Sequence, residues 1–427
     1  MLSKYDMENL KNLIELAASG DAAAQYRLAA HYDRSGKEVE ARQWTEKAAA
    51  AGHPGALYTQ ATQLLSARPE DLRIGEAVTM LSLAADAGGA AALRQLAVLS
   101  ALGLGVERNW KSAVARLAQA ARLGHPAAMR ELAVLAAIGG DRQTSAALLR
   151  EAAFNGDWIA IYLALRRGDV LSDEEGKGHA AKMRGAGVPL AQRLSDPQGK
   201  SSVVQEVDFR EITAAAAKVD PAGCIGEAKT LNTEPAIVLF EKALTVEECD
   251  YIICASAALL TPSKVVNPET SKADHAQYRT SDGAMFGLLD LDLTLIAIYA
   301  RLAQIAGVPV ENCELMGILR YAPGQEYFPH HDFLPEDAED YSEVRRSGQR
   351  TRTLLISLND EYEGGETKFP KLDITLRGAP GDAFVFHNTD DREQPYAKSL
   401  HAGAPVKSGE KWLLTLWCRA RPFWFWV

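Results

Sequence analysis

The chain has 427 residues, of which 47% are hydrophobic and 24% charged, and its formal net charge is −10. This composition is typical of a folded globular protein and excludes a disordered, collagen-like or disulfide-stapled chain. Residues 1–200 hold 24 Lys and Arg against 22 Asp and Glu, whereas the remaining 227 residues hold 22 against 34. The acidity therefore belongs to the C-terminal half, and we expect the two halves to be different domains.

Composition also limits the partners and the location of the protein. No region is strongly basic, so we expect no nucleic-acid partner. The chain lacks a run of 18 apolar residues and a signal-peptide-like start, so we expect no membrane association and a cytoplasmic location. The cysteines are odd in number and show no Cys-x-x-Cys spacing, which predicts reduced thiols packed in the core. They are Cys224, Cys249, Cys254, Cys313 and Cys418.

The N-terminal half contains an internal repeat. Glycines recur at Gly20, Gly52, Gly88, Gly124 and Gly156, with spacings of 32, 36, 36 and 32 residues. Each has an alanine three residues before it and another four residues after it. A glycine that adopts positive φ ends one helix so that the next can start at once, and alanines let neighbouring helices approach closely. The pattern predicts a stack of helix pairs, an α-solenoid.

The repeat resembles the Sel1-like repeats, which are related to the tetratricopeptide repeat, over about residues 10–190. We assign the solenoid to residues 1–195. Its concave surface would bind a peptide or a protein partner; the alternative is a rigid spacer or a dimerisation element. His53 and His125 recur at one repeat position before a proline, which favours turn residues over metal ligands.

A polar stretch rich in Pro and Gly marks a linker at 196–231, which includes a lead-in helix over 210–218. The second domain, 232–427, is predicted to contain helices over 246–259 and 291–306. Strands are predicted over 236–240, 316–321, 352–358, 382–387 and 412–419. The fold class is therefore α+β multidomain: an α-solenoid followed by a double-stranded β-helix (jelly roll) with flanking helices.

A His-x-Asp motif in the second domain indicates a metal site. On an extended strand His330 and Asp332 share a face, whereas His331 points to the other side. One imidazole and one carboxylate are two thirds of the facial triad of non-heme Fe(II) oxygenases, which leaves open positions on the metal. The third ligand is expected to be a downstream histidine. Of His387 and His401, the second is favoured because a strongly alternating strand follows it.

That strand begins with a lysine. Lys411, Leu413, Thr415 and Trp417 alternate with their neighbours and share one face. A lysine that faces the interior of a barrel needs an anionic partner. The carboxylate of 2-oxoglutarate that lies away from the metal would supply it.

These segments resemble the 2-oxoglutarate- and Fe(II)-dependent dioxygenases of the prolyl 4-hydroxylase type over about residues 232–422. The matching stretches are Arg279-Thr-Ser281, Tyr321-x-x-Gly-Gln-x-Tyr-x-x-His-x-Asp332, Glu363-Gly-Gly-Glu-Thr-Lys-Phe-Pro370 and Ser399-Leu-His-Ala-Gly403. The resemblance implies Fe(II), 2-oxoglutarate and O2 as cofactors, with ascorbate as a candidate reductant. It implies no catalytic side chain beyond the metal centre.

The resemblance also implies roles for individual residues. It makes His330, Asp332 and His401 the iron ligands and Lys411 the partner of the 2-oxoglutarate carboxylate, which the hydroxyls of Tyr321 and Thr353 help to hold. It places Tyr327, Trp417 and Arg279 at the substrate. For the two aromatic residues the alternative is core packing, and for Arg279 it is a structural salt bridge.

Three further features of the second domain are assigned less specific roles. The acidic loop at 334–348 would be a lid or a specificity element. His387 would either face the site or pack near it. The glycines between Glu363 and Glu366 predict a tight turn rather than a second carboxylate site.

The predicted activity is hydroxylation of an unactivated C–H bond, on a prolyl residue of a protein or peptide. One alternative substrate is a free amino acid or a small biosynthetic intermediate. The other alternative is a repeat scaffold whose inactive oxygenase domain senses metal or 2-oxoglutarate, and an intact triad together with Lys411 disfavours it.

Overall fold

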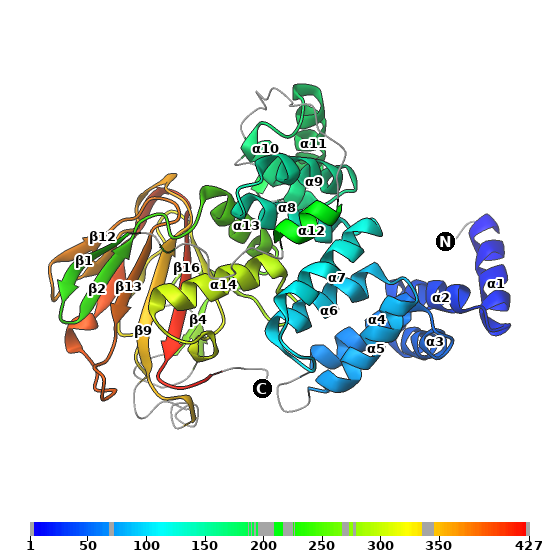
Figure 1. The fold of residues 1–427 in the computed structure, drawn as a ribbon, viewed down its shortest axis with the longest axis horizontal. Helices are drawn as coiled ribbons and strands as arrows, with labels where there is room; N and C mark the ends of the chain where they lie inside the picture. Colours follow the sequence, from blue (N-terminus) through cyan, green and yellow to red (C-terminus); the bar gives the residue numbers. More distant parts are fainter. Residues whose placement is uncertain are drawn as a thin grey trace.

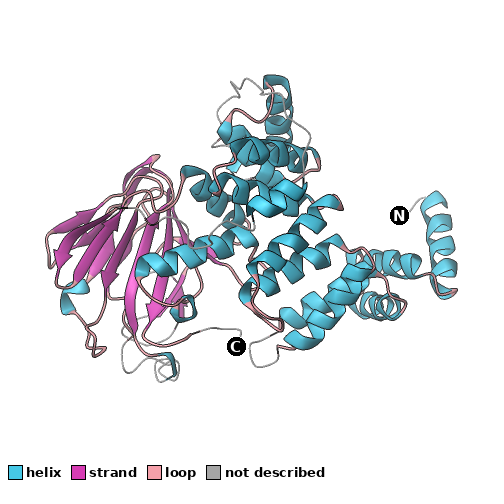
Figure 2. Cartoon of the chain, in the orientation of Figure 1, coloured by secondary structure: helices cyan, strands magenta, loops and turns pink. Residues whose placement is uncertain are grey.

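The structure is a computed structural model that describes residues 4–67, 72–186, 188, 190–191, 194, 209–216, 225, 227–266, 273–275, 279–334 and 346–423. Its first part is helical and its last part is built mainly of strands (Figures 1 and 2). The helices of the first part are α1 (Lys4–Ala18), α2 (Ala22–Arg34), α3 (Glu38–Ala50), α4 (Pro54–Leu65), α5 (Ile74–Asp86), α6 (Ala90–Leu102), α7 (Trp110–Arg122), α8 (Pro126–Ile138), α9 (Arg142–Phe154), α10 (Trp158–Arg167), α11 (Asp173–Gly185) and α12 (Phe209–Ala216). This order confirms the predicted helix-pair solenoid.

The repeated glycines end helices as predicted. Gly52 and Gly124 have φ values of 80° and 84°, and a Cβ atom at either would meet nothing within 4 Å. Glycine is therefore required by the backbone angle and not by crowding. The next helix begins directly, because His53 and His125 cap it by accepting a hydrogen bond from the backbone N–H three residues on, at 3.4 Å. Both histidines are turn residues, as their position before proline predicted.

The second part contains α13 (Val246–Ala257), α14 (Leu293–Ala306) and the short helices η3 (Val310–Asn312) and η4 (Ala397–Ser399). Its strands are β1 (Ala228–Thr233), β2 (Ala236–Phe240), β3 (Thr261–Pro262), β4 (Lys264–Val266), β5 (Ala273–His275), β6 (Asp282–Met285), β7 (Gly317–Tyr321), β8 (Tyr327–His330), β9 (Arg350–Ser357), β10 (Tyr362–Gly364), β11 (Thr367–Phe369), β12 (Ile374–Leu376), β13 (Ala383–His387), β14 (His401–Gly403), β15 (Val406–Gly409) and β16 (Lys411–Arg419). Each helix and strand predicted here is present within a few residues of its predicted bounds, and β1 begins at Ala228, ahead of the boundary predicted at 232.

Two sheets form the jelly roll. The larger has the strand order β1-β2-β13-β9-β16-β7-β6-β3 and the smaller has the order β12-β11-β14-β8. Neighbouring strands in the described sheets run antiparallel. Many of these pairs join segments far apart in the sequence, which is how β8 and β14 come to lie side by side.

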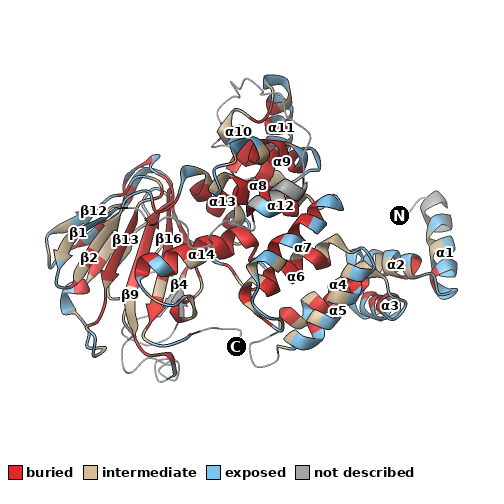
Figure 3. Cartoon of the chain, viewed as in Figure 1, coloured by how far each residue is buried: buried red, intermediate tan, exposed pale blue. Residues whose placement is uncertain are grey.

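The central strands of the large sheet, β13, β9, β16 and β7, are mostly buried, and alternation along each strand separates its two faces. On β9, Leu354 and Ile356 join the core that continues into the helices, whereas Leu355 faces the small sheet. On β16, Leu414 and Leu416 point to the helices. One face of the sheet is therefore covered by helices and the other encloses the space between the two sheets (Figure 3).

The solenoid and the jelly roll share one hydrophobic core that runs from α3 to β16. Helix α14 contacts α6 and α8 on one side and β9 and β16 on the other, and α13 contacts α10. At the start of α14, Glu131 of α8 accepts a hydrogen bond from the Leu293 backbone N–H at 3.0 Å and forms an ion pair with Arg94 of α6. The face of α6, α8 and α10 therefore holds the flanking helices of the second domain.

Within the described residues no helix is long and apolar enough to span a membrane. Cys249, Cys254, Cys313 and Cys418 are buried and form no disulfide within the described residues, as predicted, and Cys224 lies outside them. The same holds for residues 217–218 of the predicted lead-in helix.

Candidate active site

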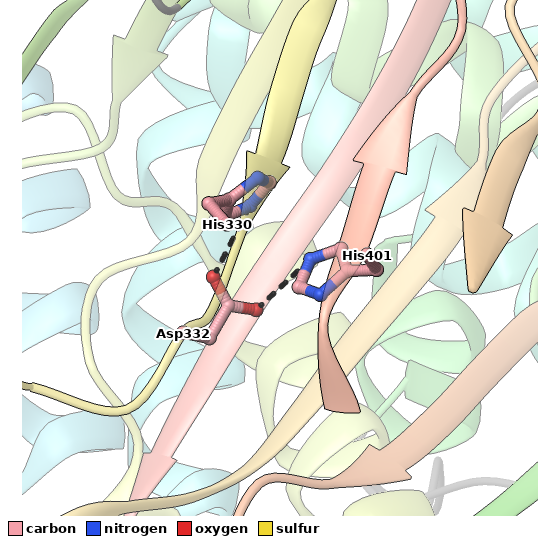
Figure 4. A group of neighbouring side chains, drawn as sticks. All are labelled: His330, Asp332 and His401. Carbon is pink, nitrogen blue, oxygen red and sulfur yellow. Dashed lines mark ion pairs between the residues drawn. The ribbon is translucent and has the colours of Figure 1, made fainter. Parts of the chain in front are cut away.

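Two histidines and an aspartate meet between the sheets. His330 ends β8 and His401 begins β14, and the two are direct partners across this antiparallel pair. Asp332 follows β8 after one residue and turns its carboxylate toward both rings (Figure 4). His330 Nε2 lies 3.7 Å from Asp332 Oδ1, and His401 Nε2 lies 3.6 Å from Asp332 Oδ2. One ligand atom from each residue falls within a 4.8 Å cluster, which is the only such cluster in the described residues.

Backbone carbonyls fix which nitrogen of each ring is free. His330 Nδ1 lies 2.8 Å from the Phe328 carbonyl oxygen, and His401 Nδ1 lies 3.0 Å from that of Ser399. A carbonyl only accepts, so both Nδ1 atoms carry a hydrogen; in the neutral ring the lone pair is then on Nε2, the atom directed at the site. Two imidazoles and one carboxylate are a donor set that suits non-heme Fe(II).

Electrostatics keep His330 and Asp332 in the protonation states that a metal needs. Burial and the neighbouring His401 lower the pKa of His330 to about 3, so its ring is neutral near pH 7. Burial opposes the charge of Asp332, but the two imidazoles and the Thr353 hydroxyl outweigh it and lower the pKa of this carboxyl group. The site is thus prepared for a cation.

The residues beside the triad support this selection of ligands. His331 points the other way, with Nε2 3.3 Å from the Ala397 carbonyl oxygen. His387 is the register partner of Arg352 on β9 and does not line the pocket. The second histidine of the cluster is therefore His401 and not His387.

Lys411 lies at the inner end of the same pocket. Its side chain is buried, and Nζ donates a hydrogen bond to the Gly365 carbonyl oxygen at 2.7 Å. Nζ also lies 5.4 Å from the centre of the Tyr321 ring, on the strand paired with β16. No Asp or Glu in the described part of the chain forms an ion pair with it, and burial lowers the pKa of Lys411 to about 8. A buried ammonium group in this state attracts an anion.

Thr353 lies beside Asp332. Its hydroxyl donates a hydrogen bond to Asp332 Oδ2 at 2.7 Å, and it accepts one from Asn388 Nδ2 at 2.9 Å. It is fully buried and is absent from the lining of the pocket. The hydroxyl hydrogen is donated to Asp332, and the expected contact of this hydroxyl with the 2-oxoglutarate carboxylate stays a prediction.

The outer part of the pocket is aromatic and cationic. The Tyr327 ring stacks on His330 with centroids 3.5 Å apart, and the Arg279 guanidinium lies 5.1 Å from the centre of Tyr327. Arg279 is buried and donates to Ser281 Oγ at 3.1 Å, but it forms no ion pair within the described residues, so the structural salt bridge is not found. The Arg350 guanidinium lies 3.9 Å from the centre of the Trp417 ring.

One pocket is lined by every predicted site residue except Thr353. The lining residues that had no predicted site role are Leu319, Leu355, Thr367, Gly403, Leu413 and Thr415. The alternation of β16 had already placed Leu413 and Thr415 on the face of Lys411. Thr367 and Gly403 lie in two of the stretches that match the family, but no site role was predicted for them. Glu363 and Glu366 flank two glycines with positive φ, which agrees with a tight turn. Residues 335–345 of the predicted lid lie outside the described residues.

Comparison with known proteins agrees with this geometry. A model of the 2OG-Fe(II) oxygenase superfamily matches residues 316–419. Prolyl 4-hydroxylase 1 of Arabidopsis thaliana is 35% identical over 213 residues, which cover 46% of this chain and 74% of the plant protein. This relative is matched over most of its length, so it shows the family.

Two solved structures are also similar to parts of the chain. A viral collagen prolyl hydroxylase from Paramecium Bursaria Chlorella virus-1, in its 2OG complex, is 27% identical, with coverage of 43% of this chain and 96% of that one and a TM-score of 0.34. A Sel1 repeat protein from Oxalobacter formigenes is 20% identical, with coverage of 43% and 87% and a TM-score of 0.35.

Membership of the oxygenase superfamily implies Fe(II), 2-oxoglutarate and O2 as cofactors, and the two imidazoles, the carboxylate and the buried lysine are groups that fit them. The chain belongs to the 2-oxoglutarate- and Fe(II)-dependent dioxygenases of the prolyl 4-hydroxylase family.

Proposed function

We propose that the enzyme hydroxylates a prolyl residue of a protein or peptide, with Fe(II) held by His330, Asp332 and His401. The observation that carries this proposal is the convergence of two free Nε2 atoms and a carboxylate within 4.8 Å, in the pocket that also holds the buried Lys411. The relative that shows the family is a prolyl 4-hydroxylase, which supports a prolyl substrate.

Different residues of the chain bind the metal, the cosubstrate and the substrate. When bound, Fe(II) with 2-oxoglutarate and O2 supplies the oxidant, so that R–H, O2 and 2-oxoglutarate give R–OH, succinate and CO2. The triad holds the metal on one side and leaves positions open toward the pocket. Lys411 and Tyr321, which are partners across β16 and β7, hold the far carboxylate of 2-oxoglutarate.

The substrate would lie against Tyr327, Trp417 and Arg279, which line the pocket. Tyr327 and Trp417 offer flat apolar surfaces to a prolyl ring, and Arg279 offers N–H donors to a peptide carbonyl. Leu319, Leu355 and Leu413 limit the water in the pocket. These side chains orient the C–H bond and add no proton-transfer group.

The proposal extends to the domain arrangement. Residues 1–195 form the solenoid, 196–231 the linker and lead-in helix, and 232–427 the oxygenase. The solenoid binds a protein partner or substrate chain for the oxygenase.

Ligand variants test the metal centre. His330→Ala and Asp332→Ala are expected to abolish succinate formation and to lose tight binding of Co2+ measured without 2-oxoglutarate. The matched control is His331→Ala, because this neighbouring imidazole points away from the site. Full activity in either ligand variant would overturn the assignment.

Substrate class is tested by following 2-oxoglutarate turnover with proline-containing peptides and with free L-proline, and by detecting the added oxygen atom by mass spectrometry. Stimulation and oxygen gain with peptides support the proposal. Stimulation by a free amino acid alone favours the small-molecule alternative. A protein that binds Co2+ and 2-oxoglutarate but turns over with neither would be a sensor.

A further inference from the structure

Each of the three proposed metal ligands has one hydrogen bond on the side that faces away from the site. The group that forms this bond differs between the histidines and the aspartate. The two histidines are held by backbone carbonyl groups, of Phe328 and Ser399. Asp332 is held by a side chain, the hydroxyl of Thr353. Of the three hydrogen bonds, only the one to the Asp332 carboxylate comes from a side chain, so only this bond can be removed by a substitution.

We propose that Asn388 and Thr353 form a hydrogen-bond relay that positions Asp332 for metal binding, and that both are positioning residues for the reaction. This inference rests on the proposed function, because it takes Asp332 as a ligand of the metal. It assigns a role to Asn388, and it gives Thr353 a role toward Asp332 besides the one expected toward 2-oxoglutarate.

The direction of every bond in the relay is determined. A carboxylate only accepts, so the Thr353 hydroxyl must donate its single hydrogen to Asp332 Oδ2. Its oxygen is then left as an acceptor, so Asn388 must present its NH2 group, which it does at 2.9 Å. The amide thus prevents the hydroxyl from rotating away, and the hydroxyl in turn fixes the rotation of the carboxylate.

Water has no access to replace these bonds. Thr353 and Asn388 have no exposed surface, and Asp332 is 6% exposed. A hydrogen bond to a charged group in such surroundings is stronger than one at the surface, and its loss leaves the carboxylate oxygen without that donor. Partners of this kind commonly change metal affinity by one or two orders of magnitude.

The backbone also holds the relay in place. Thr353 is opposite Phe386 in the pairing of β9 with β13, and Asn388 follows β13 on the same face, diagonal to Thr353. The Asn388 N–H donates to the Thr351 carbonyl at 2.8 Å, and its own carbonyl accepts from the Tyr396 N–H at 2.8 Å. The backbone of Asn388 is thus anchored through both its N–H and its carbonyl group, which holds the residue beside Thr353.

The test is the affinity for Co2+ of the full-length protein, measured without 2-oxoglutarate or substrate. Thr353→Val keeps the branched shape and removes the hydroxyl, and it is expected to weaken Co2+ binding about 10- to 100-fold. Thr353→Ser keeps the hydroxyl and is expected to bind within about threefold of the unchanged protein. Asn388→Ala leaves the hydroxyl free to rotate and is expected to weaken binding less than Thr353→Val does.

The matched control is Thr351→Val on the same strand, since the Thr351 hydroxyl donates to the Cys418 carbonyl and not to the site. Its Co2+ affinity is expected to be unchanged, and metal-free thermal unfolding verifies that each variant is folded. Should Thr353→Val fail to fold, Asn388→Ala decides the question alone. Unchanged Co2+ affinity in the folded relay variants, with His330→Ala deficient, would overturn the relay; unchanged affinity in His330→Ala would instead overturn the proposed metal site.

Discussion

The charge of Lys411 makes a prediction about pH. Because burial lowers the pKa of this side chain to about 8, the free enzyme loses the ammonium charge as the pH rises through that value. An anion beside Nζ stabilises the protonated form, so binding of 2-oxoglutarate above this pKa must take up a proton. We therefore expect the affinity for 2-oxoglutarate to fall with increasing pH.

The size of the effect follows from the pKa. At about pH 7 roughly nine in ten Lys411 side chains are protonated, and at about pH 9 roughly one in ten is, so the Kd should rise about tenfold over this interval. Beyond it the Kd should rise about tenfold for each further pH unit. His330, whose pKa is lowered to about 3, and Tyr327, whose pKa is raised by burial, do not titrate in this range.

Calorimetric titration with Mn2+ in place of Fe2+ measures this affinity without turnover, from about pH 7 to about pH 9.5. Two variants are controls. Lys411→Arg keeps its charge throughout, so its affinity should be independent of pH, whereas Lys411→Met should bind weakly at every pH. A wild-type affinity that does not change over the range, or the same pH dependence in Lys411→Met, would refute the assignment of Lys411 as the carboxylate partner.

Three further predictions concern other parts of the structure. Glu131→Leu leaves the partly buried Arg94 with only Asp292, at 3.9 Å, as a partner among the described residues, so chemical denaturation should show a loss of about 3 kcal/mol in the free energy of unfolding, against at most about 1 kcal/mol for Glu76→Leu in an exposed ion pair. Equal effects would contradict a structural role of the Glu131 contact. Arg279→Met should raise the KM for a peptide substrate about tenfold and leave the KM for 2-oxoglutarate near its wild-type value, and a change in the second alone would place Arg279 elsewhere. His387→Gln should leave both KM values unchanged, because this side chain does not line the pocket, and a shift in either contradicts that placement.

Local patterns predicted much of the fold and the site. His330 and Asp332 lie two residues apart, so the geometry of an extended strand is enough to bring them together. The alternation of β16 likewise placed Lys411 and Trp417 on one face, and both line the pocket. Repeated glycines were enough to locate the helix ends of the solenoid, because positive φ is a local requirement.

Contacts that depend on strand register could not be predicted in this way. Thr353 and Asn388 are 35 residues apart, and their contact exists only because β9 and β13 pair in one register out of several. Glu131 and Leu293 are 162 residues apart and belong to different domains. A shift of one residue in the first case would direct the Asn388 side chain to the opposite face of the sheet.

The interface with the jelly roll changes how the repeats should be understood. At the position six residues after each repeat glycine the sequence has Tyr26, Tyr58, Arg94, Arg130 and Tyr162. The two arginines are the members of this series in α6 and α8, and each lies 3.9 Å from the carboxylate of Asp292, the residue that caps α14. Tyr26, by contrast, stacks on His53 of the next repeat.

The change from tyrosine to arginine at this repeat position suits a surface that contacts another domain of the same chain. Two adjacent repeats carry an arginine at this position, and Glu131 lies beside them. These charged groups contact the N-terminus of α14. Because α14 also packs against β9 and β16, the solenoid supports the strands that carry Thr353 and Lys411. The central repeats of this protein therefore bind the oxygenase domain of the same chain. If the Glu131 variant loses activity, the effect would be transmitted to the site through α14 and would not indicate a missing partner protein.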